Sequence, residues 1–313
     1  MDKKHVVFFS CLAGAVAFGI LIPYFGFAHK GYIRPTTDSK SWMSNISDDT
    51  TLDMISMPGT HNSGALHSIA DVSGKCQDIS IYNQLTIGAR FLDIRAQSVA
   101  NKLAVCHVYI NEDLTFESVL SDCRKFLQEN RSETIVFSVK EEEDAVSSTL
   151  SFNDVLLNEI EEYKEFFYLG DSIPTLGLAR GKMVLLSRFK NNTVGISARS
   201  GWRDSCTFDL NNTTKLHVQD YYSVAAIDNK KQEIESCLKY SSDYYTSHDD
   251  QILTLNFLSG TLSNDFPPSY SVHVAEEINP WALEVLPNYK ATGIAIFDFL
   301  DMDLAKAVWS KNL

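Results

Sequence analysis

From residue 50 onward, short apolar runs rich in β-branched and aromatic residues alternate with polar or helix-like stretches. Runs of this length and composition are typical of strands that are buried on both faces of a sheet. Eight runs follow one another: DMISMPGTH ending at His61, ARFLDIRA around Arg95, KLAVCHV around His107, TIVFSVKEE around Lys140, KMVLLSRF around Arg188, LHVQDYY around Asp220, ILTLNFLSG around Asn256 and GIAIFDFLD around Asp298.

Two of the intervening stretches carry apolar residues at spacings of three and four, which is the core-facing stripe of an amphipathic helix. These residues are Phe116, Val119, Leu120, Cys123, Phe126 and Leu127, and then Phe152, Val155, Leu156 and Ile160. Strands that alternate with helices predict an α/β fold with a parallel sheet, and eight strands predict a single distorted TIM (β/α)8 barrel. We expect this barrel to span residues 45–313, after a linker at 29–44.

Residues 1–28 have a basic tip and then a charge-free apolar run from Val6 to Ala28, interrupted at Pro23. The run is longer than the usual core of a signal peptide, which favours a membrane anchor, whereas Gly26-Phe27-Ala28 resembles a small-x-small cleavage site. Both alternatives predict export. We therefore expect a secreted or extracytoplasmic protein, anchored through residues 6–28 if the segment is retained.

The balance of charged residues argues against one class of partner. The 27 basic and 40 acidic residues give a formal net charge of −13, and no block of Lys or Arg interrupts the acidic balance. Nucleic-acid binding would therefore lack its electrostatic driving force.

The cysteines predict little cross-linking and no zinc site. With Cys11 in the leading segment, five cysteines remain, so at least one thiol is free. Cys206 and Cys237 are the pair that we expect to be bonded. No CxxC motif or Cys/His spacing indicates zinc.

Polar residues stand near the ends of seven of the predicted strands, each after several apolar residues. They are His61, Arg95, His107, Lys140, Arg188, Asp220 and Asp298. A single polar residue at a strand end is usually part of a loop. In a barrel, however, the carboxyl ends of the strands meet at one mouth, so the seven together predict a functional site.

The residue types in this set suit an acid/base transfer reaction. Two histidines can divide the work, one accepting a proton from a nucleophile and the other protonating a leaving group. Asp298 is suited to orient one imidazole, and Arg95 is suited to hold an anion such as a phosphate. The set therefore indicates phosphoryl transfer.

Seven blocks resemble, in order, those of the bacterial phosphatidylinositol-specific phospholipases C. They are SMPGTHNSG, ARFLDIR, CHV, ETIVFSVKEE, RGKMVLLSRF, VQDYYSV and GIAIFDFLD, and the similarity spans roughly residues 45–310. The resemblance implies a distorted TIM barrel that cleaves phosphatidylinositol to diacylglycerol and a cyclic inositol phosphate without a metal. It also implies a monomer that acts on phosphatidylinositol or glycosyl-phosphatidylinositol lipids at a membrane surface.

The resemblance assigns roles by position. His61 is similar to the family's general base, which takes the proton from the inositol 2-hydroxyl, and Asp298 to its orienting partner. His107 is similar to the general acid that protonates the departing diacylglycerol oxygen, and Arg95 to the clamp on the phosphate. The residues that resemble the family's inositol pocket are Lys140, Arg188, Asp220 and Tyr222.

One position departs from the bacterial pattern and leaves an alternative open. Asn62 stands where the bacterial enzymes have an Asp that couples the general acid to the arginine. The eukaryotic relatives have His-Asn there and use the Asn to ligate calcium. Asn62, Asp93 and Glu141 or Glu143 offer hard oxygen ligands, yet Arg95 would place a fixed cation in the same space. We therefore expect no cofactor, with calcium as the alternative, and interpret residues 141–144, EEED, as a solvated loop.

Two other functions remain open from the sequence. The chain could be a barrel that binds inositol lipids or membranes with little turnover, because Asn62 lacks the carboxylate. It could also be a calcium-dependent phosphodiesterase. The candidates for membrane contact are Phe266, Pro267, Pro268 and Tyr270, or Trp202, although ordinary loop packing also explains them.

Overall fold

The structure is a computed structural model that describes residues 36–67, 74–107, 110–247, 250–263 and 270–313, with only the backbone of 107 and 110–113. The predicted signal or anchor segment and residues 264–269 lie outside the described residues. Within those ranges no helix is both long enough and apolar enough to cross a bilayer.

Strands from across the chain form one mixed sheet. They are β1 (Met57–Thr60), β2 (Phe91–Val99), β3 (Lys102–His107), β4 (Ile110–Thr115), β5 (Ile135–Val146), β6 (Phe167–Tyr168), β7 (Met183–Arg188), β8 (Ile196–Ser197), β9 (Thr207–Asn211), β10 (Lys215–Gln219), β12 (Ile252–Phe257) and β14 (Ile294–Phe297). Its order is β6-β7-β5-β2-β1-β14-β12-β10-β9, and every pair from β6 to β10 is parallel. A separate pair joins β11 (Ser223–Val224) to β13 (Thr261–Leu262).

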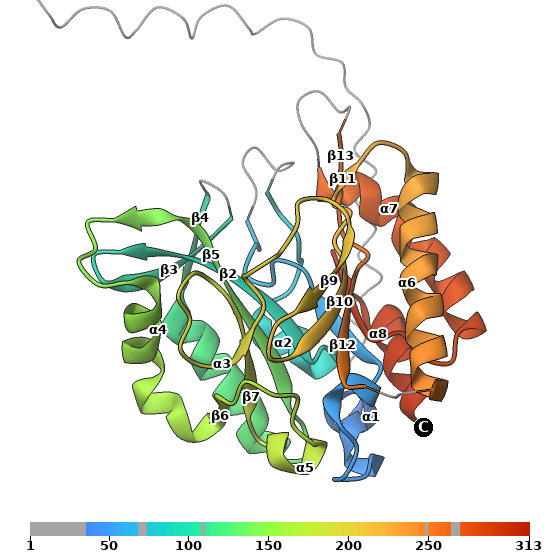
Figure 1. The fold of residues 1–313 in the computed structure, drawn as a ribbon, viewed down its shortest axis with the longest axis horizontal. Helices are drawn as coiled ribbons and strands as arrows, with labels where there is room; N and C mark the ends of the chain where they lie inside the picture. The colour runs from blue at the N-terminus through green and yellow to red at the C-terminus, as the bar shows by residue number, and fades with distance from the viewer. Residues whose placement is uncertain (1–35, 68–73, 108–109, 248–249, 264–269) are drawn as a thin grey trace, which may run out of the picture. The chain divides into compact units, whose positions relative to one another are not determined.

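Helices connect and cover the strands (Figure 1). They are α1 (Thr37–Ser41), α2 (Ile81–Ile87), α3 (Phe116–Glu129), α4 (Phe152–Ile160), α5 (Leu176–Ala179), α6 (Ile227–Ser247), α7 (Ser271–Val285) and α8 (Met302–Trp309). The two predicted helices are confirmed as α3 and α4, and all the stripe residues are buried. Side chains at the helix starts explain the boundaries, because Thr115 and Ser151 each accept a hydrogen bond from the backbone three residues on.

The end of the predicted linker packs onto the sheet domain. Residues 37–45 form α1 and a 3-10 turn, and Trp42 and Met43 are buried in the core. The Trp42 indole donates a hydrogen bond to the Gly88 carbonyl at 3.0 Å. The described part of the chain, from residue 36 onward, forms one compact unit.

The parallel sheet is strongly curled. Arg188 ends β7 and Phe257 ends β12, five strands apart in the sheet order. Five steps in a flat sheet would separate these strands by about 24 Å. Instead, the Arg188 guanidinium lies 5.7 Å from the centre of the Phe257 ring. Side chains at the carboxyl ends of distant strands therefore meet.

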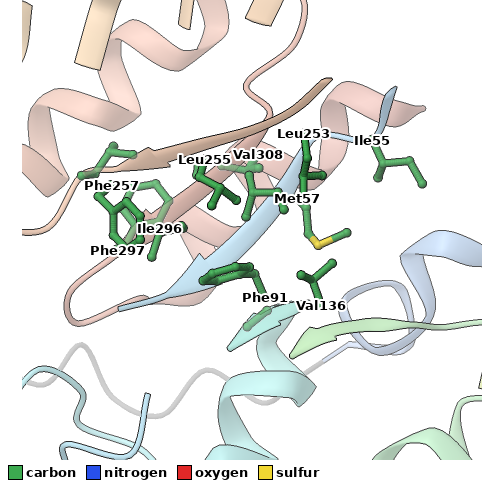
Figure 2. Close-up of a cluster of buried hydrophobic side chains, with 14 of the residues drawn as sticks. Ile55, Met57, Phe91, Val136, Leu253, Leu255, Phe257, Ile296, Phe297 and Val308 are labelled. Atoms are coloured by element: carbon green, nitrogen blue, oxygen red, sulfur yellow. The ribbon is translucent and has the colours of Figure 1, made fainter. Parts of the chain in front are cut away.

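Alternate residues of β2, β5 and β7 enter different apolar clusters, as expected of strands covered on both faces. Phe91, Val136 and Val184 belong to the first cluster. Their strand neighbours Leu92, Phe137 and Leu185 belong to the second, which α3 and α4 complete. Figure 2 shows part of the first cluster, where side chains from β1, β2 and β12 pack together.

The α/β class is confirmed, but the expectation of eight parallel strands is wrong for one run, and the described strands follow an open order from β6 to β9 and not a closed barrel. The run KLAVCHV forms β3, which is antiparallel to β2 and pairs with β4. It is the middle of a hairpin extension outside the parallel series. The apolar pattern of KLAVCHV could not distinguish a parallel strand from an antiparallel one, because a short apolar run fits either direction of pairing.

The predicted disulfide is also wrong. Cys206 and Cys237 are both free thiols. Cys237 lies on the core-facing side of α6, where burial raises the pKa of its thiol. Cys206 precedes β9, and its side chain is partly buried against the first apolar cluster.

Candidate active site

The site begins with a buried His–Asp pair at the ends of neighbouring strands. His61 follows β1 and Asp298 follows β14, and these two strands pair in parallel register. The His61 Nδ1 lies 2.7 Å from the Asp298 Oδ1, and the aspartate is 1% exposed. Parallel pairing thus places in contact two residues that are 237 positions apart in the chain.

Local features of the chain fix where the His61 ring lies. A side chain at Gly59 would place a Cβ 2.8 Å from the Phe91 Cβ, so only glycine allows β1 and β2 to approach here. Asn62 has a φ of 41°, a left-handed conformation that Asn tolerates, and it turns the chain directly after His61. The Gln77 amide then donates hydrogen bonds to the His61 and Phe297 carbonyls, both at 2.9 Å.

Arg95 determines the tautomer of His61. Its Nη2 lies 2.7 Å from the His61 Nε2, and an arginine can only donate. The Nε2 must therefore be the unprotonated acceptor, and the Nδ1 carries the proton toward Asp298. The pair is arranged as a general base whose unprotonated nitrogen faces the cation.

Three cations stand side by side across adjacent strands. Arg95 is the register partner of Lys140, and Lys140 is the register partner of Arg188. Paired residues of parallel strands share one face of the sheet. The row Arg95, Lys140 and Arg188 thus forms a cationic floor beside His61, suited to an anionic substrate.

Asp93 lies beneath this row and holds two of its members. Its Oδ2 accepts from the Arg95 Nε at 3.2 Å, and its Oδ1 accepts from the Arg188 Nη1 at 2.9 Å. Burial by itself raises the pKa of Asp93, but the two guanidinium groups hold it well below its usual range. Asp93 is therefore an anion that fixes the clamp. The sequence signal was its position two residues before Arg95 on the same strand face.

The interpretation of EEED as a solvated loop is wrong, because residues 141–144 lie within β5, and Glu142 belongs to the site. Glu141 pairs with Ala96 and Glu143 with Gln97, which leaves Glu142 as the extra residue of a β-bulge. Its carboxylate contacts Arg95 at 3.2 Å and the Lys140 Nζ at 2.6 Å. Burial raises the pKa of Glu142, but these cations outweigh burial and lower it to about 2.

An aromatic wall stands opposite the histidine. The Arg188 guanidinium lies 3.8 Å from the centre of the Trp202 ring, and the Trp202 indole donates to the Asp220 Oδ2 at 3.0 Å. The Phe257 ring contacts Trp202 at 6.3 Å and the His61 ring at 6.2 Å. Trp202 is therefore part of the site, and the Tyr270 ring packs on His273 at 5.2 Å. Their contact with a membrane stays a prediction.

The remaining predicted residues lie at the rim or next to the turn. The Tyr222 hydroxyl donates to Asp204 at 2.6 Å, which raises the pKa of Tyr222 to about 12, and its ring is 41% exposed. Asn62 is fully buried, and neither atom of its amide has a partner among the described residues. His107 is the last residue of β3, but its side chain lies outside the described residues.

The hairpin explains how His107 comes to this edge. In the antiparallel pairing Val105 lies opposite Ala96, so the strand returns toward Arg95 as it reaches His107. Because β3 is antiparallel to β2, the convergence of parallel strand ends does not explain the position of His107. The hairpin, not the parallel pairing of strands, brings this residue toward the site.

Two of the oxygen ligands named in the calcium alternative, Asp93 and Glu141, have other surroundings in the structure. Both oxygens of Asp93 accept from arginines, and Glu141 shares a face with Ala96 of the second apolar cluster. Among the described residues, the His, Cys, Asp and Glu atoms close enough to share an ion are those of His61, Cys76 and Asp298, within 4.8 Å of one another. A thiol-containing set does not suit calcium.

Comparisons with known proteins show which enzymes this chain is similar to. The family model for the phosphatidylinositol-specific phospholipase C X domain matches residues 56–189. The 1-phosphatidylinositol phosphodiesterase of Listeria monocytogenes is 29% identical over 292 residues, covering 90% of this chain and 87% of that protein. The Staphylococcus aureus enzyme of the same name is 28% identical over 312 residues, covering 93% and 92%.

The solved structures agree along nearly the whole chain. A phosphatidylinositol-specific phospholipase C from S. aureus superposes with a TM-score of 0.79 at 28% identity, covering 88% of this chain and 98% of that one. This chain is similar to bacterial phosphatidylinositol-specific phospholipases C over most of its length. The L. monocytogenes phospholipase C superposes with a TM-score of 0.70 at 27% identity, covering 88% and 99%. The phospholipase C likeness thus extends well beyond the residues that the family model matches.

Proposed function

We propose that this chain cleaves phosphatidylinositol to diacylglycerol and inositol 1,2-cyclic phosphate, with His61 as the general base. The observation that carries the proposal is the arrangement of His61 between Asp298 and Arg95. It leaves a basic nitrogen next to a cation that is held in place for a phosphate. A protein that only binds lipid would not need an unprotonated imidazole nitrogen at this position.

The first step uses the unprotonated Nε2 of His61. This nitrogen takes the proton of the inositol 2-hydroxyl while the hydroxyl oxygen attacks phosphorus. Asp298 stabilises the imidazolium that forms, because its carboxylate accepts the Nδ1 proton. Nucleophile and phosphorus belong to one molecule, which gives the attack a proximity advantage.

The cationic row stabilises the charge that develops on the phosphate. Arg95 is nearest to the base, and its position is fixed by Asp93 and Glu142 before the substrate arrives. Hydrogen-bond donors that are already oriented before the substrate binds usually provide the largest part of the rate enhancement. Substrate binding must open or share the contact between Arg95 and His61, since both groups face the reacting atoms.

The second proton comes from His107. The bond between phosphorus and the diacylglycerol oxygen breaks, and His107 protonates that oxygen as it leaves. We assign this role from the family resemblance and from the course of β3 toward Arg95. We propose that no metal takes part, because Arg95 supplies the positive charge at the phosphate.

The inositol ring is expected to bind between the cationic row and the aromatic wall. Lys140, Arg188 and Asp220 offer donors and acceptors for its hydroxyls, and the exposed ring of Tyr222 is suited to stack on it. The curled sheet that joins these residues fits a distorted, open TIM barrel. We further propose that the protein is an exported monomer that acts at a membrane surface, with residues 6–28 as the export or anchor segment.

The test is a head-group-resolved product analysis with vesicles of phosphatidylinositol, with and without EDTA. We expect diacylglycerol and inositol 1,2-cyclic phosphate to appear at the same rate in both. Saturable vesicle binding without diacylglycerol would favour the lipid-binding alternative. Activity that is lost in EDTA and restored by calcium would favour the calcium-dependent phosphodiesterase.

The Asn62→Asp variant tests the one departure from the bacterial pattern. In the bacterial enzymes that this chain resembles, an Asp at this position couples the general acid to the arginine, so a carboxylate at the buried position of Asn62 is expected to form a charge-assisted bond. Such a bond exceeds a neutral one by about 1 to 1.5 kcal/mol, so turnover should stay level or rise by up to about tenfold. Initial rates on phosphatidylinositol vesicles measure this.

Asn153→Asp is the matched control, because Asn153 is also buried but accepts its hydrogen bonds at Thr193, away from the site. Its rate should equal that of the wild type. A collapse of activity in a folded Asn62→Asp variant, with Asn153→Asp unchanged, would mean that the place of Asn62 in the site is misassigned.

A further inference from the structure

A lysine is buried beneath the pocket without a carboxylate partner. Lys230 lies in the first turn of α6 and is 0% exposed. No carboxylate within the described ranges lies at ion-pair distance from it. Taking an ammonium group out of water without a counter-ion is costly, and a side chain such as Met would fill the same space without that cost. A buried lysine without a counter-ion, such as Lys230, therefore indicates a role other than packing.

The ammonium group instead joins the carboxyl ends of two strands. It donates to the Phe257 carbonyl at 2.6 Å, where β12 ends, and to the Tyr221 carbonyl at 2.8 Å, just after β10. It also lies 3.4 Å from the Oε1 of Gln219, the last residue of β10. All three partners are oxygens, which matches the three donors of a protonated lysine. In Figure 1, α6 runs alongside β10 and β12.

The two strand ends that Lys230 joins carry the walls of the substrate pocket. Asp220 stands between Gln219 and Tyr221 and accepts the hydrogen bond of Trp202. Phe257 contacts both the Trp202 ring and the His61 ring. A shift of either strand end would therefore move the head-group residues and the general base relative to each other.

We propose that Lys230 is a positioning residue for catalysis, which locks the ends of β10 and β12 so that Asp220, Trp202 and Phe257 face His61. The inference rests on the proposed cleavage of phosphatidylinositol for its kinetic readout. Its structural readout is independent of that activity. Lys230 itself touches neither the substrate nor the reacting atoms.

The test compares Lys230→Met with Lys230→Arg and with Lys239→Met as the control. Lys239 lies on the same helix, where it pairs with Asp243 on the surface. In Lys230→Met, kcat/KM on phosphatidylinositol vesicles should fall by about ten- to a hundredfold, since misplacement by an ångström has effects of that size. Lys230→Arg retains the cation and should recover part of the loss. Lys239→Met should match the wild type.

Two further measurements separate positioning from a purely structural role. At pH 6, where Lys230 is protonated in the folded chain, the melting temperature of Lys230→Met should equal or exceed that of the wild type, because a buried unpaired charge has been removed. Hydrogen exchange should become faster only in peptides that cover residues 219–224 and 256–260. A general packing role would instead lower stability and activity together.

The pH dependence of stability provides a third readout. Burial lowers the pKa of Lys230 to about 7 in the folded chain. The nearby groups Asp220, Asp298, Glu233 and Cys237 have the opposite, smaller effect and raise this pKa. Between that pH and about 10.5, the unfolded chain binds the extra proton. The wild type should therefore gain stability relative to Lys230→Met as the pH rises through this window, and lose it as the pH falls to 7.

Full activity in a folded Lys230→Met variant would overturn the proposal, and so would unchanged exchange at both strand ends. Failure of Lys230→Met to fold would also overturn it, because Lys230 would then be structural. A wild type that releases no diacylglycerol would refute the proposed function instead, and the exchange experiment would still decide whether Lys230 locks the strand ends.

Discussion

Replacing His61 with alanine should lower kcat on phosphatidylinositol by about 10²- to 10⁴-fold, the range for loss of a general base. The reason is structural, because no other basic nitrogen among the described residues combines an Asp partner with a contact to Arg95. The measurement is the initial rate of inositol 1,2-cyclic phosphate release from vesicles. The melting temperature should change little, since the ring lies at the edge of the core.

His217→Ala is the matched control for this variant. His217 forms the same kind of pair, with its Nδ1 2.7 Å from the Asp209 Oδ1, but it stacks on Tyr240 away from the site. The His217→Ala change removes an imidazole ring and its contact with Asp209, but it leaves the proposed catalytic residues unchanged. Equal losses in the two variants, or full activity in His61→Ala, would contradict the role of His61.

The second large effect is expected for Asp298→Asn. An amide in place of the carboxylate can donate to the Nδ1 of His61, which would leave the proton on the Nε2 and block it as a base. An amide also cannot stabilise the imidazolium. A wrong tautomer of this kind can lower kcat by up to about 10⁴-fold while the geometry is kept. The measurement is kcat at saturating substrate, with KM expected to change far less.

Asp209→Asn is the control for this change, because it makes the same substitution at the His217 pair. Its kcat should be that of the wild type. An Asp298→Asn variant that keeps most of its kcat would show that His61 needs no carboxylate partner, and the proposed first step would have to be abandoned.

The sequence predicted the parts of the site that depend on strand pattern alone. His61, Arg188, Asp220 and Asp298 each end or follow an apolar run, and parallel pairing brings the ends of such runs to one edge. Arg95 and Lys140 lie within their strands, but register pairing still places them beside Arg188. Periodicity also predicted the buried stripes of α3 and α4.

Other features depend on geometry that the period of a sequence does not encode. Glu142 enters the site through a β-bulge, which adds one residue and re-aims the side chain. Trp202 comes from a loop, and Lys230 lies in a polar segment that would be solvated in most helices. The antiparallel hairpin of β3 was likewise not distinguishable from a barrel strand. In each case tertiary contacts override the local pattern.

The most direct test is nitrogen NMR of the His61 imidazole in the free protein at neutral pH, with His61→Ala to assign the signals. The proposed mechanism predicts an unprotonated Nε2 and a protonated Nδ1, because Arg95 can only donate and Asp298 accepts. The Asp298→Asn variant should reverse or mix the two forms. A proton on the Nε2 of the wild-type ring would contradict the assignment of His61 as the base.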